Sequence, residues 1–400
     1  MKKNFLHIHD EFEYTWLGKD NGMIPIYMSE VCGYNSYILT NDIKHELPDV
    51  FRSVHIVKVK RLFKKIGNFA YFIKLLRRLN IFKYLIKNAK EIDVLMLFHI
   101  SRCSYWYAFV YKLLNKTGKV YIKADFNLEV YQKEIRRLNT KSRTFKDFFK
   151  KINEIAEYKK RKKLVTMVDL ISYETEDSYN EMKYSYAGVD TKGKVIYLPN
   201  GYDNLEIERN YKIKNMDNKK NIILTVGRLG TEAKNTEFLL ESLKKIDFKD
   251  WKFYFVGSET KEFQIYKDNF FNKYPYLKEK ILFLGEIKDR KKLYSLYNEA
   301  KVFVLPSKWE SFGIVMVEAM AFGEYIITSN TCAANDITKN GEIGKIISID
   351  EDKELVNSIQ DVINNKIDLK LKYDKTLEYV KKFRYENIIK NLNEGLKWKK

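Results

Sequence analysis

The chain has 400 residues, which is enough for two or three domains with sizeable hydrophobic cores. Its 73 Lys and Arg against 53 Asp and Glu give a formal net charge of +20, which predicts attraction to polyanions such as nucleic acid, anionic lipid or phosphorylated substrates. The three cysteines, Cys32, Cys103 and Cys332, are widely spaced and odd in number. They argue against a disulfide framework or a zinc cluster and favour a reducing compartment.

Residues 1–14 contain no apolar core of the length of a signal peptide, so we expect no export signal. No run of the sequence approaches the roughly 18 apolar residues that span a bilayer. We therefore expect a cytoplasmic protein, or one bound to the inner face of the cell membrane.

Short apolar runs alternate with helical stretches through the first half of the chain. A strand at 4–8 precedes a loop at 17–24 and a helix from about residue 23 to residue 32, in which Pro25 falls in the first turn. Further strands are predicted at 36–40, 55–59, 94–99, 120–123, 170–173 and 195–198. Such alternation is typical of a doubly wound α/β sheet.

The pattern restarts after the Pro-Asn-Gly run at 199–201. Strands are predicted at 221–226, 251–256, 281–284, 301–305 and 325–328, and helices near 236–245, 291–299, 312–323 and 374–398. Gly323 stands where a glycine commonly ends a helix. The sequence therefore predicts two Rossmann-like α/β halves.

Two glutamates flank a Ser-Phe-Gly turn after the strand at 301–305. Glu310 falls in the loop before the helix, and Glu318 lies in an otherwise apolar or small helical window. A charge in such a helix must find partners, because uncompensated burial costs several kcal/mol. Vicinal hydroxyls of a polyhydroxylated ligand are such partners. Alternatively, Glu318 is a core carboxylate paired with a lysine, and Glu310 is a solvated loop residue.

This Glu-x7-Glu spacing resembles the donor-sugar signature of the retaining glycosyltransferases of family 4, also called group 1, which have the GT-B fold. Arg228 in Val-Gly-Arg-Leu and Lys234 in the following Lys-Asn resemble the loop that holds the nucleotide diphosphate in that family. The run at 198–203 (LPNGYD) resembles its interdomain hinge. The resemblance covers about residue 191 to the C-terminus and is loose before that.

The resemblance implies two Rossmann-like, doubly wound parallel-sheet domains with an interdomain cleft. Residues 1–199 would form an acceptor-binding domain, and residues 200–379 would bind a nucleotide sugar. A helix at about 380–400 would pack back on the first domain.

The resemblance also implies roles for single residues. Arg228 and Lys234 would hold the diphosphate, Glu310 the hydroxyls of the donor sugar, and Glu318 the ribose. The remaining implied positions are Ser311, the amides of Phe312, Gly313 and Ile314, the backbone at Ile287 beside the nucleobase, and Gly22 in a loop ahead of the first helix.

One departure concerns the strand at 120–123. Many members of the family end the corresponding strand with a histidine near the anomeric carbon, whereas this chain offers Lys123 and Asp125. Asp125 is our candidate to orient the acceptor hydroxyl or to stabilise oxocarbenium charge. His99, which ends the preceding predicted strand, is a second candidate, and its alternative reading is an ordinary loop histidine.

No cofactor and no metal are expected. The one Asp-x-Asp, at 350–352, falls in an acidic turn that we interpret as surface, so fixed cations and helix N-terminal amides are the alternative for holding a departing diphosphate. The resemblance implies that the anomeric configuration is retained and that a leaving phosphate oxygen accepts the acceptor's proton.

Two segments, 58–90 and 133–163, interleave basic and apolar residues at helical spacing, which is typical of binding to an anionic membrane surface. Solvated helices with an apolar core face are the alternative. We expect no nucleic-acid partner, because no recognisable module is present. The sequence thus predicts a retaining, metal-independent glycosyltransferase that uses a nucleotide-sugar donor and a glycan or lipid-linked acceptor. The alternatives are a non-catalytic nucleotide-sugar or polyanion-binding subunit, and an epimerase or phosphorylase of the same fold.

Overall fold

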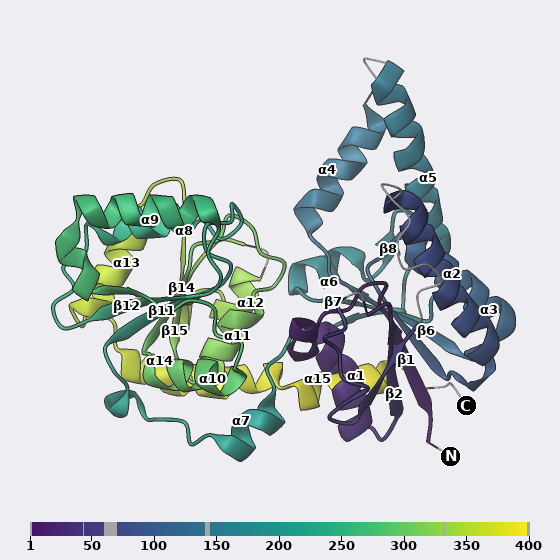
Figure 1. The fold of residues 1–400 in the computed structure, drawn as a ribbon, viewed down its shortest axis with the longest axis horizontal. Coiled ribbons are helices and arrows are strands. Elements are labelled where there is room, and N and C mark those ends of the chain that lie inside the picture. The colour runs from purple at the N-terminus through teal and green to yellow at the C-terminus, as the bar shows by residue number, and fades with distance from the viewer. Residues whose placement is uncertain (1, 43, 60–69, 141–144, 332, 398–400) are drawn as a thin grey trace. The chain divides into compact units, whose positions relative to one another are not determined.

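Parallel β-sheets organise the computed structural model, which describes residues 2–42, 44–59, 70–140, 145–331 and 333–397 (Figure 1). The chain divides into a first unit, Met1–Pro199 with Tyr385–Lys400, and a second unit, Asn200–Arg384. Residues 60–69 and 141–144 of the two basic segments lie outside the described residues. Among the described residues, no helix has both the length and the apolar composition needed to cross a bilayer.

The first unit is built on an eight-stranded sheet in the order β10-β7-β6-β5-β1-β2-β4-β3. Its strands are β1 (Asn4–Ile8), β2 (Asn35–Thr40), β3 (Val50–Phe51), β4 (Val54–Lys58), β5 (Val94–Phe98), β6 (Lys119–Ala124), β7 (Leu170–Tyr173) and β10 (Val195–Tyr197). All neighbours pair in parallel except β3 with β4. A separate antiparallel pair joins β8 (Ser185–Tyr186) to β9 (Val189–Asp190).

Helices cover both faces of this sheet. Its helices are α1 (Asp20–Glu30), α2 (Ala70–Asn88), α3 (Arg102–Leu114), α4 (Leu128–Asn139), α5 (Phe145–Met167), α6 (Glu176–Met182) and α15 (Tyr385–Gly395). Side chains of α2, α3 and α5 share one hydrophobic cluster with inward residues of the strands, among them Ile171. Leu170 points to the other face because strand side chains alternate, and it is there that Gly395 of α15 lies against it. The rings of Tyr27 in α1 and Tyr385 in α15 are 5.5 Å apart.

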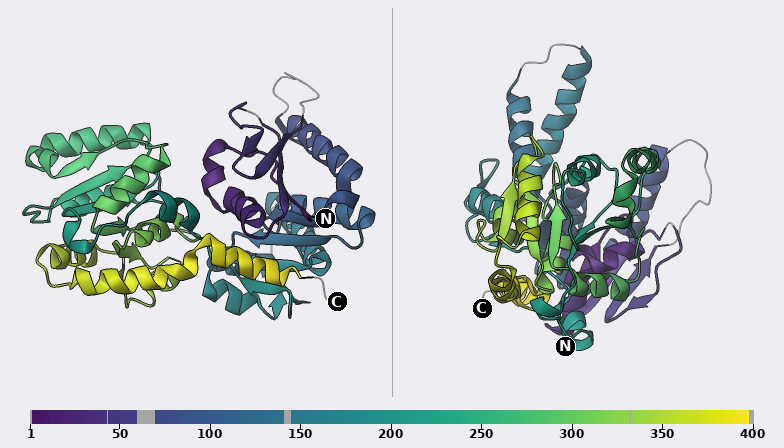
Figure 2. Two further views of the ribbon diagram at one scale, coloured as in Figure 1. Left: turned by 90° about the horizontal axis from the view of Figure 1, so that it is seen from below. Right: turned by 90° about the vertical axis from the view of Figure 1, so that its left-hand side faces the viewer.

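Helices α4 and α5 form an antiparallel pair that projects beyond the sheet (Figure 1). Figure 2 shows the same projection in a view turned by 90°. Ion pairs join the two helices: Arg161 donates to Glu134, with one nitrogen–oxygen distance of 3.0 Å, and Arg137 lies 2.9 Å from Glu154.

The second unit has six parallel strands in the order β13-β12-β11-β14-β15-β16. They are β11 (Ile222–Val226), β12 (Lys252–Val256), β13 (Ile281–Phe283), β14 (Val302–Leu305), β15 (Tyr325–Ser329) and β16 (Gly344–Ile347). The helices are α7 (Asn204–Asn210), α8 (Thr236–Leu243), α9 (Lys261–Lys273), α10 (Arg290–Glu299), α11 (Ile314–Ala321), α12 (Ala334–Thr338), α13 (Lys353–Ile363) and α14 (Leu369–Tyr379).

Separate core clusters lie on the two faces of this second sheet, one with α10 and α11 and the other with α8, α9 and α13. The strand order reverses between β11 and β14. In open α/β sheets, ligands bind outside the carboxyl ends of the strands at such a switch point.

The structure confirms the predicted strands to within a residue at most ends, and Gly323 has the positive φ of 78° of a helix-ending glycine. Two predictions are wrong. The helix expected from about residue 23 begins at Asp20, after a 3-10 helix at Tyr14–Gly18. The helix expected at 374–398 is two helices, α14 and α15, separated by a 3-10 turn at Val380–Phe383. The Phe383 carbonyl at this break accepts the Tyr202 amide at 3.0 Å, a long-range bond that a local pattern does not contain.

Candidate functional site

Two loops of the second unit meet at its topological switch point. One follows β11 and the other follows β14, its neighbour in the sheet. The loops are joined by the Lys308 amide, which donates to the Ala233 carbonyl at 2.9 Å, and by the Asn235 side chain, which donates to the Pro306 carbonyl at 3.3 Å. The sheet and these bonds together fix the geometry of both loops.

An ion pair links the loops. Lys234 Nζ donates to Glu310 Oε2 at 2.6 Å, and the two side chains are only 14% and 17% exposed. A Cβ at Gly227 would lie 3.2 Å from Lys234 Cε, closer than most Cβ contacts, so the glycine lets the lysine stem lie across the backbone. Two of the four charged residues predicted for the donor thus contact each other directly.

The loop after Glu310 leads into α11. Gly313 precedes the helix with a φ of 84°, and a side chain there would collide with the methyl of Met316. Phe312 is buried, with its ring centroid 6.0 Å from that of Phe383. The amides that open α11, at Ile314 and beyond, form the positive end of the helix dipole, which favours an anion.

Glu318, one turn into α11, is buried and paired. Arg290 of α10 donates to Glu318 Oε1 and to the Tyr294 hydroxyl, and the Tyr297 hydroxyl donates to Glu318 Oε2 at 3.4 Å. Burial works against the charge of Arg290, but Glu318 and Tyr294 outweigh it and hold its pKa well above the ordinary value. The core-carboxylate reading of Glu318 therefore finds a cationic partner here, an arginine rather than a lysine.

Arg290, Tyr294 and Tyr297 were not among the residues predicted for the site. The signal was present, since residues 290, 294 and 297 recur at helical spacing on one side of α10. The sequence alone does not show that α10 packs beside α11, so the contact of these residues with Glu318 could not be predicted.

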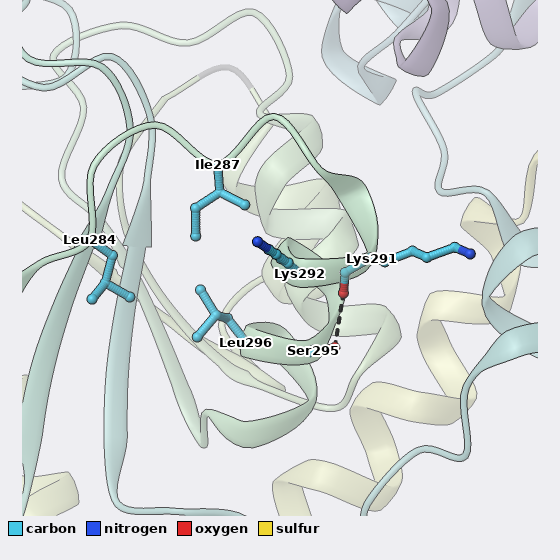
Figure 3. A pocket seen from close by; sticks show the side chains of 6 residues that line it. All are labelled: Leu284, Ile287, Lys291, Lys292, Ser295 and Leu296. Atoms are coloured by element: carbon cyan, nitrogen blue, oxygen red, sulfur yellow. Dashed lines mark hydrogen bonds between the residues drawn. The ribbon is translucent and has the colours of Figure 1, made fainter.

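The remaining predicted donor residues are Arg228, Ser311 and Ile287, each within six residues of Lys234, Glu310 or Arg290 in the sequence. Arg228 is exposed, and its carbonyl accepts the Thr231 hydroxyl at 2.9 Å. Ser311 is half-buried in the turn before α11. Ile287 lines a pocket of about 470 Å³ at the start of α10 (Figure 3). The other lining residues are Leu284, Lys291, Lys292, Ser295 and Leu296.

In the first unit, charged side chains gather at the carboxyl ends of neighbouring strands. Lys123 of β6 is wholly buried; its Nζ donates to the Leu198 carbonyl at 3.2 Å and lies 3.8 Å from Glu174 Oε2. Burial raises the pKa of Glu174 well above its usual range, with Asp125 adding to the rise and Lys123 opposing it. Burial likewise raises the pKa of Asp20.

The two predicted residues of this edge, His99 and Asp125, are neighbours. His99 is exposed with a φ of 63°, and its Nδ1 lies 3.3 Å from the Asp125 carbonyl oxygen. Among the residues that the structure describes, no group of three His, Cys, Asp or Glu side chains has an arrangement that could hold a metal ion.

Gly22 lies elsewhere than predicted. It is buried in the first turn of α1 rather than in a loop before the helix. A Cβ at this position would come within 2.5 Å of the Leu17 backbone, so close packing of the 3-10 helix on α1 accounts for the glycine.

Residues 206–383 match the family model described as glycosyl transferases group 1. Over 195 residues, the chain is 29% identical to the capsular polysaccharide biosynthesis glycosyltransferase CapM of Staphylococcus aureus, covering 48% of this chain and 49% of that one. Over 158 residues, it is 28% identical to the phosphatidyl-myo-inositol mannosyltransferase of Mycobacterium tuberculosis, covering 39% of this chain and 40% of that one. The chain thus spans less than half the length of these curated relatives.

Solved structures resemble the chain over nearly its whole length. Sucrose-phosphate synthase from Thermosynechococcus elongatus superposes with a TM-score of 0.69 at 18% identity, covering 98% of both chains. HepE from Anabaena, solved in complex with UDP, gives a TM-score of 0.67 at 15% identity, covering 99% of both chains. The chain as a whole has the GT-B fold, and residues 206–383, which carry Lys234, Glu310 and Glu318, match the family model of the group 1 glycosyltransferases.

Proposed function

We propose that this protein is a retaining, metal-independent glycosyltransferase that moves a sugar from a nucleotide-diphosphate sugar to a glycan or lipid-linked acceptor. The product belongs to a surface polysaccharide, a capsule or a lipopolysaccharide. The observation that carries the proposal is the ion pair of Lys234 with Glu310 at the carboxyl ends of β11 and β14, inside the family-matching segment. A cation and a carboxylate held side by side can grip a phosphate and a sugar hydroxyl of one donor.

The donor diphosphate is held by fixed cations and helix amides. Arg228 offers a planar fork to phosphate oxygens, and Lys234 a compact charge. The amides at Phe312, Gly313 and Ile314 add the positive end of α11. These groups stabilise the charge that develops on the departing diphosphate, and a preorganised donor of this kind typically contributes about 2.7–4 kcal/mol to the transition state.

The rest of the donor is held by carboxylates and backbone. Glu310 accepts hydrogen bonds from sugar hydroxyls, and Ser311 lies in the same turn. Glu318, held in place by Arg290, accepts from the ribose hydroxyls. The backbone at Ile287 faces the nucleobase.

The first unit binds the acceptor, and Asp125 orients its hydroxyl with His99 beside it. The acceptor oxygen attacks the anomeric carbon on the face from which the diphosphate leaves. The new carbon–oxygen bond forms as the bond to the phosphate oxygen breaks, and that phosphate oxygen takes the hydroxyl proton. The anomeric configuration is retained, and no separate base is required.

The relatives support the class of reaction. CapM is named for capsular polysaccharide biosynthesis, the mycobacterial relative for transfer to a phosphatidyl-inositol lipid, and HepE was solved with UDP. A lipid-linked acceptor fits a cytoplasmic enzyme that works at the inner face of the membrane.

A thermal-shift series with UDP-, GDP- and ADP-sugars, each with and without a chelator, tests the donor and the metal independence together. We expect the sugars of one nucleobase to raise the melting temperature equally in both conditions. Absence of any shift would contradict the donor assignment, and a shift that requires a divalent metal would contradict metal independence.

Turnover tests the residues. Donor hydrolysis or transfer to extracted lipid acceptors should be lost in Arg228→Ala and Glu310→Gln proteins that still melt normally, and kept in Glu342→Gln, a matched change in an exposed ion pair with Lys339. Undiminished turnover in the first two variants would overturn these assignments.

A further inference from the structure

Three neighbouring helices of the first unit cover one face of its sheet. The inward sides of α2, α3 and α5 are buried in the core cluster through residues such as Ile81, Tyr111 and Leu164. Helix α3 lies between the other two: the rings of Phe82 in α2 and Tyr107 in α3 are 4.9 Å apart, and α3 and α5 are joined by an Arg102–Glu157 ion pair of 3.3 Å. The outward sides of the three helices therefore form one surface that faces away from the sheet (Figure 1).

Large apolar side chains line this outward surface. Trp106, Phe109 and Leu113 of α3 are 41%, 41% and 67% exposed, and their i, i+3, i+7 spacing places them in one row along the helix. Leu79 and Ile86 of α2 are exposed beside them at i and i+7. Single exposed apolar residues are ordinary, but a contiguous apolar patch typically marks an interaction site.

Most of the charge on the same surface is positive, and the acidic Glu157 of α5 is paired with Arg102 of α3. Neither the α2 sequence nor the α3 sequence contains an Asp or a Glu. Lys83 and Lys87 of α2 are exposed next to Ile86, and Lys159 and Lys163 of α5 are exposed on the far side of α3. The Lys160 ammonium lies over the Trp106 ring, 5.1 Å from its centroid.

We propose that this outer face of α2, α3 and α5 docks on an anionic lipid bilayer. The outer face comprises Leu79, Lys83, Ile86, Lys87, Trp106, Phe109, Leu113, Lys159, Lys160 and Lys163. Aromatic and aliphatic side chains enter the boundary between head groups and acyl chains, while the lysines around them meet lipid phosphates. Lysines alone would suit either a lipid surface or nucleic acid. The exposed apolar row favours lipid, because it can be buried in a bilayer.

The structure adds α3 to what the sequence offered. The two basic segments at 58–90 and 133–163 predict membrane contact from charge, and they leave out the Trp106 row entirely. The proposed surface places that row between helices α2 and α5. A surface docked on a bilayer would give the proposed glycosyltransferase access to a lipid-linked acceptor. Only this benefit rests on the proposed function, because vesicle binding itself is measured without any donor.

Sedimentation of the full chain with vesicles tests the proposal. The vesicles are phosphatidylcholine alone or phosphatidylcholine with added phosphatidylglycerol, at low and at high salt. We expect binding to the anionic vesicles that weakens with salt, and a loss of about five-fold for each of the changes Lys83→Gln and Lys87→Gln. The pair Trp106→Ser and Phe109→Ser should weaken binding at least ten-fold at both salt concentrations, because burial of apolar surface is not screened.

The matched control is Ile265→Ser with Tyr276→Ser, two exposed apolar residues of the second unit. This pair should leave vesicle binding unchanged. Equal binding of the control and the Trp106/Phe109 variant would overturn the proposal, as would equal binding to neutral and anionic vesicles. If the protein binds no vesicles, and if both the unchanged protein and the Trp106/Phe109 variant are retained on RNA or DNA, the surface binds nucleic acid instead and the proposal is wrong. Turnover with a soluble acceptor reports separately on the proposed transfer activity.

Discussion

Replacing Lys234 by methionine separates the contribution of its ion pair with Glu310 to folding stability from its contribution to catalysis. The substitution removes the ammonium that donates to Glu310 Oε2 at 2.6 Å. It keeps an unbranched apolar chain of similar length across Gly227, so the packing of the loop changes little.

Two free-energy terms follow from the geometry. Removing one partner of a fully buried ion pair costs about 3–5 kcal/mol of folding stability, whereas an exposed pair contributes about 0–1 kcal/mol. With 14% and 17% exposure, this pair lies between the two cases, and water can reach the remaining carboxylate. We therefore expect a loss of about 1–3 kcal/mol in the stability of the second unit. Loss of a fixed cation at the departing diphosphate should lower kcat by about 100- to 1,000-fold.

The chain provides a matched control for the stability term. Lys267 pairs with Glu259 at 2.5 Å, and the two side chains are 19% and 10% exposed. Lys267→Met should therefore destabilise the second unit about as much as Lys234→Met does. The assay measures melting temperature and kcat with a nucleotide sugar for both variants. If the two lose turnover equally, the ion pair of Lys234 is structural and the proposed donor site is wrong.

Further predictions address the same units. Gly227→Ala should lower kcat roughly ten-fold at an unchanged melting temperature, because its Cβ would push the Lys234 stem by a few tenths of an ångström; full activity would show that the position of the ammonium does not matter. Glu324 is wholly buried, neither carboxylate oxygen has a hydrogen-bond partner among the residues that the structure describes, and burial raises its pKa well above the usual range. A raised carboxyl pKa gives stability that is present at low pH and lost as pH rises, so Glu324→Met should raise the melting temperature more at about pH 8 than at about pH 5; an equal shift would refute the burial argument. Burial lowers the pKa of His7 to about 3 from an ordinary 6.5, so stability is present above pH 6.5 and falls on acidification towards pH 3. His7→Asn should thus recover roughly 2 kcal/mol at about pH 5 relative to its effect at pH 7, as measured by urea unfolding.

Most of the fold was predictable because each buried parallel strand leaves a local mark. A strand such as β14 is covered on both sides, so its four residues are all apolar and stand out in the sequence. The loop after it then falls at the carboxyl edge of the sheet, which is how Glu310 could be placed in the loop between this strand and the next helix. The helix end at Gly323 was predictable for a similar reason, because it depends only on the positive φ of that one residue.

The partners of the site were not predictable, because they come from other elements. Glu318 is 28 residues from Arg290, and nothing in either sequence window says that α10 lies beside α11. The burial of Lys123 was hidden for the same reason. Its carbonyl partner, Leu198, is 75 residues away, so a residue that looked like the polar end of a strand is wholly buried.

The two units also differ in how their charges are balanced, and a sequence pattern does not report this. In the second unit, each glutamate of the proposed site has its own cation, Lys234 or Arg290. In the first unit, Asp20 and Glu174 both interact with the single buried Lys123, and burial raises the pKa of both carboxyls. Such fixed pairs are compatible with the diphosphate donor that we propose. Burial favours the protonated form of both carboxyls in the first unit, so the proposed acceptor-binding roles there call for tests by titration as well as by substitution.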